Sequence, residues 1–340
     1  MRRREFVAGT AATAAIGLTN RTHAQTDSRL PSKKRIAIFH PFEPPEGLSV
    51  NGRRAFKAFF GEPNKLGCIE GQNLIVERYS ALGQPDRIGD LAREIVASHP
   101  DLIIALGGTI ARILKPLTTT IPILATTADP VAGGIVTNLA KPGGNITGIS
   151  VFAGLEIAGK RLQFLRETVG KLTNVCVLFP TSVVPFWEMT KATFLETAAG
   201  AGIPISTAVV TGKLDRDAYE RAFDEMRAGK VDGVLVGDAS ENVTNRHVIV
   251  ELAATHSLPA IYPYSEFVEV GGLMSYGVDL SDVDRRLADM TDEVLRGAKP
   301  ADIPYRQQTK FELVLNRKTA ASLGLEFPPT LLTAADEVIE

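Results

Sequence analysis

Two stretches of the chain decide the fold: PDLIIALGGT at residues 100–109 and VDGVLVGD at residues 231–238. Each contains a short apolar run that ends at a glycine, a pattern typical of a strand buried on both faces of a sheet. A second pair agrees, because IPIL at 121–124 resembles LPAI at 258–261. We interpret these internal similarities as evidence of two similar α/β lobes, roughly 31–148 and 152–275.

Strands and helices alternate through both predicted lobes. The spacing predicts strands at 35–39, 73–79, 102–106, 121–125, 174–179, 204–210, 231–236 and 258–262, and helices at 86–98, 188–201 and 216–228. This alternation predicts βαβ units, and so two Rossmann-like lobes with parallel sheets. The remainder starts no third lobe. We expect 278–310 to complete the first lobe and 311–340 the second, so that a multi-strand hinge joins them.

Composition excludes several classes of protein. The chain has 340 residues, 44 % of them hydrophobic and 22 % charged, with a formal net charge of -2. These values are ordinary for a globular protein and argue against disorder or a multi-span membrane protein. The balanced charge argues against a nucleic-acid partner. Two cysteines are too few for a disulfide scaffold, and we expect Cys68 and Cys176 to be free and buried.

The first residues predict export. Arg2-Arg3-Arg4 precedes a small, apolar run from Val7 to Leu18, and Thr22-His23-Ala24 has the small residues of a cleavage site. This pattern indicates a signal peptide over 1–24 and a periplasmic protein. Arg3-Arg4 followed by x-Phe-Val is similar to a twin-arginine signal; a Sec signal with a basic start is the alternative.

The motifs of common enzyme classes are absent from the sequence. There is no P-loop, no Gly-x-Gly-x-x-Gly after the first strand and no Gly-x-Ser-x-Gly elbow. The histidines lack metal-ligand spacing, and we interpret Asp282, Asp284, Asp289 and Asp292 as a solvated helix face. We therefore expect no enzyme activity, no cofactor and no metal.

Candidate ligand contacts stand where the predicted strands end, since ligands of open parallel sheets bind beyond the carboxyl ends of the strands. The candidates are His40, Phe42, Gly108, Thr109, Thr126, Asp129, Phe179, Asp238, Tyr262 and Tyr276. Each has a structural alternative: Thr109, Asp129 and Asp238 as helix caps, and the aromatic residues as core. Tyr264 and Trp187 are further aromatic candidates for walls of the site.

Several longer motifs carry a family resemblance. They are Leu106-Gly-Gly-Thr109, Asp129-Pro130-Val131, Leu139-Ala-Lys-Pro-Gly-Gly-Asn145-Ile-Thr-Gly148, Gly159-Lys-Arg161-Leu162, Leu258-Pro-Ala-Ile-Tyr262 and Gly271-Gly-Leu-Met-Ser-Tyr-Gly277. In this order the chain resembles the TrpX-like ABC transporter substrate-binding proteins, which have the type I periplasmic binding fold. The resemblance implies that Thr109, Asp129, Asp238 and Tyr276 contact ligand. The chain departs from the family pattern at Thr181–Pro185, where the family usually has an Asn-containing loop.

The resemblance implies a monomeric periplasmic receptor for a small molecule. The receptor would close two lobes around an amino acid, aromatic amino acids among the candidates, and deliver it to an ABC permease and its ATPase. Closure is favourable because the ligand contacts both lobes. We expect Gly148 and Gly277 to act in the hinge. The alternatives are a sensor subunit that binds the same ligand and a two-lobed enzyme.

Overall fold

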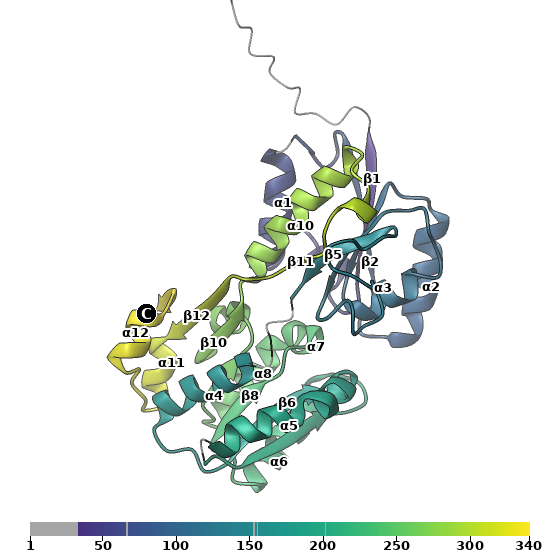
Figure 1. The fold of residues 1–340 in the computed structure, drawn as a ribbon. Coiled ribbons are helices and arrows are strands. Elements are labelled where there is room, and N and C mark those ends of the chain that lie inside the picture. Colours follow the sequence, from purple (N-terminus) through teal and green to yellow (C-terminus); the bar gives the residue numbers. More distant parts are fainter. Residues whose placement is uncertain (1–32, 66, 152–153, 155, 201) are drawn as a thin grey trace, which may run out of the picture.

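The computed structural model describes residues 33–340 except 66, 152–153, 155 and 201, and it contains two α/β lobes (Figure 1). The predicted signal peptide lies outside the described residues. The sheet of the first lobe contains β1 (Lys34–His40), β2 (Leu74–Ser80), β3 (Leu102–Leu106), β4 (Ile123–Thr127), β5 (Ile146–Ser150) and β11 (Arg306–Gln307). Its strand order is β11-β5-β4-β3-β1-β2, and every pair is parallel.

The second lobe has its own sheet. It contains β6 (Val175–Pro180), β7 (Ile205–Val210), β8 (Gly233–Val236), β9 (Ala260–Tyr262), β10 (Met274–Val278), β12 (Phe311–Asn316) and β13 (Glu337–Ile339). The order is β13-β12-β10-β9-β8-β6-β7. β12 pairs antiparallel with β10 because it enters from the opposite lobe, so the predicted all-parallel sheet is right except at this pair.

Helices cover both faces of each sheet (Figure 1). The first lobe has α1 (Arg54–Lys65), α2 (Pro85–Ala97), α3 (Gly108–Leu114), α10 (Leu280–Leu295) and the 3-10 turns at Pro45–Gly47 and Pro300–Asp302. The second lobe has α4 (Glu156–Val169), α5 (Val184–Gly200), α6 (Arg216–Ala228), α7 (Ser240–Thr244), α8 (Arg246–Thr255), α9 (Ser265–Glu269), α11 (Arg317–Ser322), α12 (Pro329–Ala334) and a 3-10 turn at Thr181–Val183.

The core explains why the strands are continuously apolar. In β1, Ile36 and Ile38 pack toward α1 and α10, whereas Ala37 and Phe39 pack toward α2 and α3. Successive strand residues point to opposite faces, so a sheet covered on both sides needs apolar residues at every position. The carboxyl ends of the strands remain uncovered by helices, and the cavity described below lies there.

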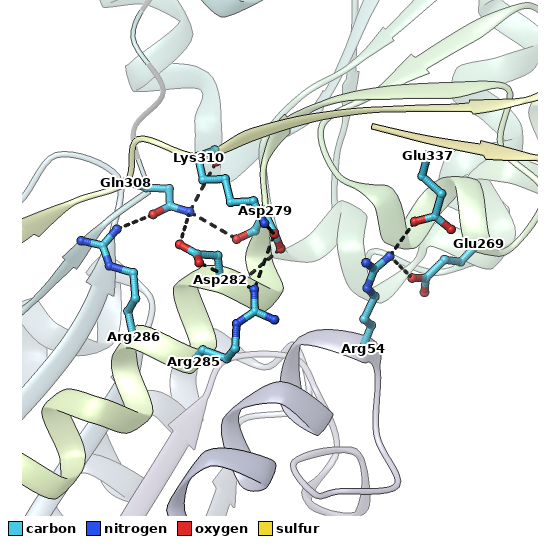
Figure 2. A network of polar contacts seen from close by, with 9 residues as sticks. All are labelled: Arg54, Glu269, Asp279, Asp282, Arg285, Arg286, Gln308, Lys310 and Glu337. Atoms are coloured by element: carbon cyan, nitrogen blue, oxygen red, sulfur yellow. Dashed lines mark hydrogen bonds and ion pairs between the residues drawn. The ribbon is translucent and has the colours of Figure 1, made fainter. Parts of the chain in front are cut away.

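The chain crosses between the lobes at three places: after β5, between β10 and α10, and between β11 and β12 (Figure 1). The crossings are tied together. Gln308 N–H donates to the Ser150 carbonyl at 3.0 Å, and Asp279 N–H donates to the Lys310 carbonyl at 3.2 Å. The Lys310 ammonium donates to the Asp279 carboxylate at 2.7 Å (Figure 2). We propose that the predicted lobe boundaries lie in these crossing segments.

The two glycines expected in the hinge lie inside strands. A Cβ on Gly148 in β5 would stand 1.9 Å from the Ala125 carbonyl oxygen of β4. A Cβ on Gly277 in β10 would stand 1.9 Å from the Pro263 carbonyl oxygen. The structure therefore requires glycine at both positions for close backbone approach.

Gly148→Ala tests this requirement. The added methyl group has to displace the backbone of β4, and overpacking of this kind costs about 1–3 kcal/mol. We expect the thermal midpoint to fall by roughly 3–10 °C, at about 2–4 °C per kcal/mol. Gly144→Ala is the matched control, because a Cβ at Gly144 meets nothing within 4 Å. Equal midpoints for the two variants would contradict the packing argument.

Candidate functional site

A cavity of about 420 Å³ lies between the two lobes. The first lobe lines it with the segments that follow β1, β3 and β4, and the second lobe with those that follow β6, β8 and β9. The carboxyl ends of both sheets thus face one space, as expected for parallel sheets. Its volume lies within the range of about 300–1,000 Å³ for small-molecule sites.

Six of the ten candidate residues line this cavity. They are His40, Phe42, Gly108, Thr109, Thr126 and Asp238. The first five come from the first lobe, and Asp238 comes from the second, directly after β8 and Gly237. The structure brings them together, and their contact with a ligand stays a prediction.

The other four candidates do not line the cavity. Phe179 and Tyr262 are buried in the second lobe; Phe179 packs against Trp187, and Tyr262 stacks on Phe267 at 4.9 Å between ring centroids. Both belong to strands, and alternation turns their side chains into the sheet faces. Phe179 and Tyr262 are therefore core residues, which was the structural alternative for the aromatic candidates. Trp187 also lies outside the cavity lining.

Tyr276 and Asp129 have local partners. The ring of Tyr276 packs edge-on against Phe164 at 5.1 Å between centroids. Asp129 Oδ1 accepts hydrogen bonds from the backbone N–H groups of Val131 and Ala132, both at 2.9 Å. Asp129 thus caps the turn that follows β4; the expected alternative was the cap of a helix, and the structure has a turn there instead.

Asp238 is held by a buried arginine. Arg161 in α4 is buried, and its two terminal nitrogens donate to the two carboxylate oxygens of Asp238, each at 2.8 Å. Its Nε donates to the Tyr276 carbonyl at 2.6 Å. Burial opposes the charge on Arg161, but the Asp238 carboxylate outweighs it and raises the pKa of the guanidinium. The Asp238 side chain keeps 46 % of its surface exposed, so the remaining lone pairs are open to the cavity.

His40 organises the first-lobe wall. Its Nδ1 accepts the backbone N–H groups of Phe42 at 3.0 Å and Glu43 at 2.8 Å. Burial, with a smaller contribution from Arg53, lowers the pKa of His40 to about 3. The imidazole is therefore neutral and its Nδ1 unprotonated, which fixes the loop that presents Phe42 to the cavity.

Several charged residues of the site were not predicted from the sequence. Glu43, Arg53, Glu241 and Asp284 line the cavity. The interpretation of Asp284 as part of a solvated helix face is wrong, since only 7 % of it is exposed and one turn of α10 places it against α1. The only signal for Asp284 is its place on the apolar face of the 282–296 helix, next to Val283 and Leu287. No motif marks the others.

Burial raises the pKa of Asp284 to about 7; Arg53 opposes this shift and Glu266 adds to it. Its Oδ2 is buried and has no hydrogen-bond partner among the described residues. The carboxylate form is therefore poorly stabilised here. Burial likewise raises the pKa of Glu312, in β12 beside the crossing, to about 7.

Within the described ranges of the chain, no group of three or more acidic, histidine or cysteine side chains is arranged to hold a metal ion. None of the helices in the described residues is both long enough and apolar enough to cross a membrane. Cys68 and Cys176 are free and buried, as expected.

Two α/β lobes that are joined by three connecting segments and that together line one cavity define a two-lobed ligand-binding protein. The family model for ABC transporter substrate binding proteins matches residues 63–339, and the chain belongs to this family. The resemblance inferred from the sequence motifs is thereby confirmed.

Similar proteins agree with this assignment. A tyrosine-binding protein of Clostridioides difficile (strain R20291) is 24 % identical over 303 residues, which cover 89 % of this chain and 84 % of that protein. A Streptococcus pneumonia ABC domain in complex with L-Trp matches with a TM-score of 0.78 and 24 % identity, over 91 % of this chain and all of that one. A conserved domain protein of Vibrio cholerae matches with a TM-score of 0.78, 23 % identity and coverage of 90 % and 100 %. The two structures show that the fold is shared.

Asp284→Asn tests whether burial raises the pKa of the Asp284 carboxyl in the cavity lining. An acid whose folded pKa lies above its ordinary value stabilises the fold most when protonated, and this stability declines as the pH rises from about 4 to about 7. The asparagine variant removes that decline, so we expect its thermal midpoint to exceed that of the parent at pH 8 and the gap to narrow at pH 5. Glu312 has a similar shift and leaves a residual decline. Asp90→Asn, at a surface position, is the control; an equal pH profile for all three proteins would contradict the raised pKa.

Proposed function

We propose that this chain is the solute receptor of an ABC importer and that it binds an amino acid, with an aromatic amino acid favoured, in the cavity between its lobes. The observation that carries the proposal is the Asp238 carboxylate, fixed by Arg161 and open to a cavity that both lobes line. A ligand that touches both lobes stabilises their closed arrangement over the open one.

The two ends of an amino acid have different partners here. The carboxylate of Asp238 suits a ligand ammonium, because charge-assisted hydrogen bonds of this kind are short and strong. On the facing lobe, Gly108, Thr109 and Thr126 line the cavity, and they carry backbone N–H groups and hydroxyls. These groups suit the ligand carboxylate. The proposed orientation therefore places the ligand backbone across the cleft.

An aromatic side chain has apolar surroundings in the same cavity. Phe42, Phe56 and Tyr264 line it, together with Leu106 and Ile88. The names of two similar proteins favour this class, since one is a tyrosine-binding protein and the other was crystallised with L-Trp. Aromatic rings gain both from buried area and from edge or face contacts with other rings.

The proposal includes no covalent chemistry. His40, the histidine of the cavity, uses its Nδ1 to hold a loop, and Asp238 is engaged with Arg161. Mass spectrometry of a ligand recovered after long incubation should show it unchanged. A changed product would promote the enzyme alternative.

We further propose export to the periplasm through Arg3-Arg4 and delivery of the ligand to a permease and its ATPase. Replacing both arginines with lysine should retain the protein in the cytoplasm if the signal is of the twin-arginine type, whereas a Sec signal tolerates the change. A gene pair for a permease and an ATPase beside this gene would favour transport over the sensor alternative.

Thermal unfolding against a ligand panel tests the proposed function. The protein is unfolded and refolded first, to remove carried-over ligand, and then mixed with the twenty amino acids, sugars, purines and dicarboxylates. A ligand at 100 times its dissociation constant adds about 2.7 kcal/mol, a shift of roughly 5–10 °C. We expect the largest shift with tyrosine or tryptophan. A shift with sugars alone would overturn the amino-acid class.

Asp238→Asn tests the predicted ammonium contact. Loss of a charged hydrogen bond costs about 1.5–3 kcal/mol, so affinity for the amino acid identified by the panel should fall ten- to a hundredfold in calorimetry. Asp129→Asn is the comparison, because the structure places Asp129 on a turn outside the cavity lining. Unchanged affinity in the Asp238 variant would refute the contact.

A further inference from the structure

Two successive arginines at the start of α1 reach from the first lobe to the second. Arg53 Nη1 lies 3.1 Å from Glu266 Oε1, and Arg54 Nη1 lies 3.3 Å from Glu269 Oε1. Both glutamates belong to α9, one turn apart. Arg54 also lies 3.2 Å from Glu337 of β13 (Figure 2). At each of these contacts a basic side chain of the first lobe meets an acidic side chain of the second.

The two arginines differ in burial. The side chains of Arg53 and Glu266 are 11 % and 2 % exposed, whereas those of Arg54 and Glu269 are 42 % and 35 % exposed. Water screens an exposed pair, which therefore contributes little. A buried pair interacts in a lower dielectric, and its energy depends strongly on both partners being present. Arg53 and Glu266, which we call the inner pair, are therefore the two residues able to couple the lobes.

Arg53 is oriented by its own lobe. Its guanidinium lies over the ring of Phe56, 4.1 Å from the centroid, and its Nε lies 3.9 Å from the Glu43 carboxylate. These contacts remain when the lobes separate, because Phe56 and Glu43 belong to the first lobe. The arginine is therefore held toward α9 in advance, and pairing with Glu266 costs little side-chain entropy.

The Glu266 carboxylate has Arg53 as its ion-pair partner among the described residues, whereas Arg53 also lies 3.9 Å from Glu43. Arg53 Nε and Glu266 Oε2 are buried without a hydrogen-bond partner in the described part of the chain, and so is Asp284 Oδ2 beside them. Removing Arg53 leaves Glu266 as a buried charge without an ion-pair partner among the described residues, whereas removing Glu266 leaves Arg53 with the more distant Glu43 carboxylate. Lobe opening is the motion that returns such a charge to water.

We propose that Arg53 and Glu266 form an interlobe latch that holds the closed arrangement and raises ligand affinity through closure. Arg53 reaches the cavity wall, but Glu266 is absent from its lining, so the glutamate acts through Arg53 and is a positioning residue. The affinity effect rests on the proposed function; the effect on closure does not.

The test measures interlobe distance by fluorescence energy transfer in the full chain without ligand. Labels go on cysteines introduced at Asp90 in α2 and Arg227 in α6, two exposed positions in different lobes. We expect Glu266→Gln and Arg53→Met each to lower the transfer efficiency, and the double variant to lower it by less than the sum of the two. Glu269→Gln is the matched control one turn along α9 and should leave efficiency unchanged.

Ligand affinity is the second readout. With the amino acid identified by the panel, Glu266→Gln should weaken binding at least tenfold and Glu269→Gln less than twofold. Glu266→Asp keeps the charge and serves if the glutamine variant fails to fold; it should lie between parent and Gln. Unchanged transfer efficiency in the Glu266 variants, or additive effects in the double variant, would overturn the latch. If no panel ligand binds, the proposed function fails while the transfer experiment still decides the latch.

Discussion

The contact between Asp279 and Lys310 is the constraint on which the two-lobed arrangement depends. These residues stand in two of the three segments that cross between the lobes, and they are joined through their backbones and side chains. Burial alone would raise the pKa of Asp279, but the Lys310 ammonium and the N–H of Asp282 lower it and keep the carboxylate ionised. Gln308 extends the contact to Asp282 at 3.2 Å (Figure 2). Its backbone N–H also donates to the carbonyl of Ser150, the last residue of β5 before the remaining crossing. The crossings therefore behave as one connected unit.

This unit explains why the cavity is built from strand ends. Each crossing begins at the carboxyl end of a strand: β5 and β10 leave their sheets there, and β11 leaves the first sheet beside β5. The same edge of each sheet must then face the other lobe. Residues that follow β1, β3, β4, β6 and β8 are brought to one cavity by this geometry, whatever their identity. The fold supplies the cleft, and individual side chains such as Asp238 supply the chemistry.

The sequence predicted the elements that are locally encoded. The β3 strand at Leu102–Leu106 and the α6 helix at Arg216–Ala228 have the predicted bounds, because an apolar run between turn signals and an amphipathic period are local features. Gly108, Thr109 and Asp238, which line the cavity, were predicted for the same reason, as polar or flexible positions directly after such runs. Phe179 and Tyr262 occupy comparable positions, yet strand alternation, which a short run does not reveal, turns them into the core.

The charged part of the site depends on tertiary contacts instead. Arg161 lies in α4, a helix that the sequence analysis did not predict. It donates to the carboxylate of Asp238, which lies 77 residues further along the chain. Arg53 and Glu266 are separated by 213 residues, and no spacing connects them. Their burial also has a desolvation cost: the Glu266 side chain is 2 % exposed, and its Oε2 has no hydrogen-bond partner among the described residues. Contacts of a ligand with both walls add to the Arg53–Glu266 attraction and oppose this desolvation cost. A receptor balanced in this way keeps a closed population without ligand, through the Arg53–Glu266 pair, and closes more fully when its cavity is occupied.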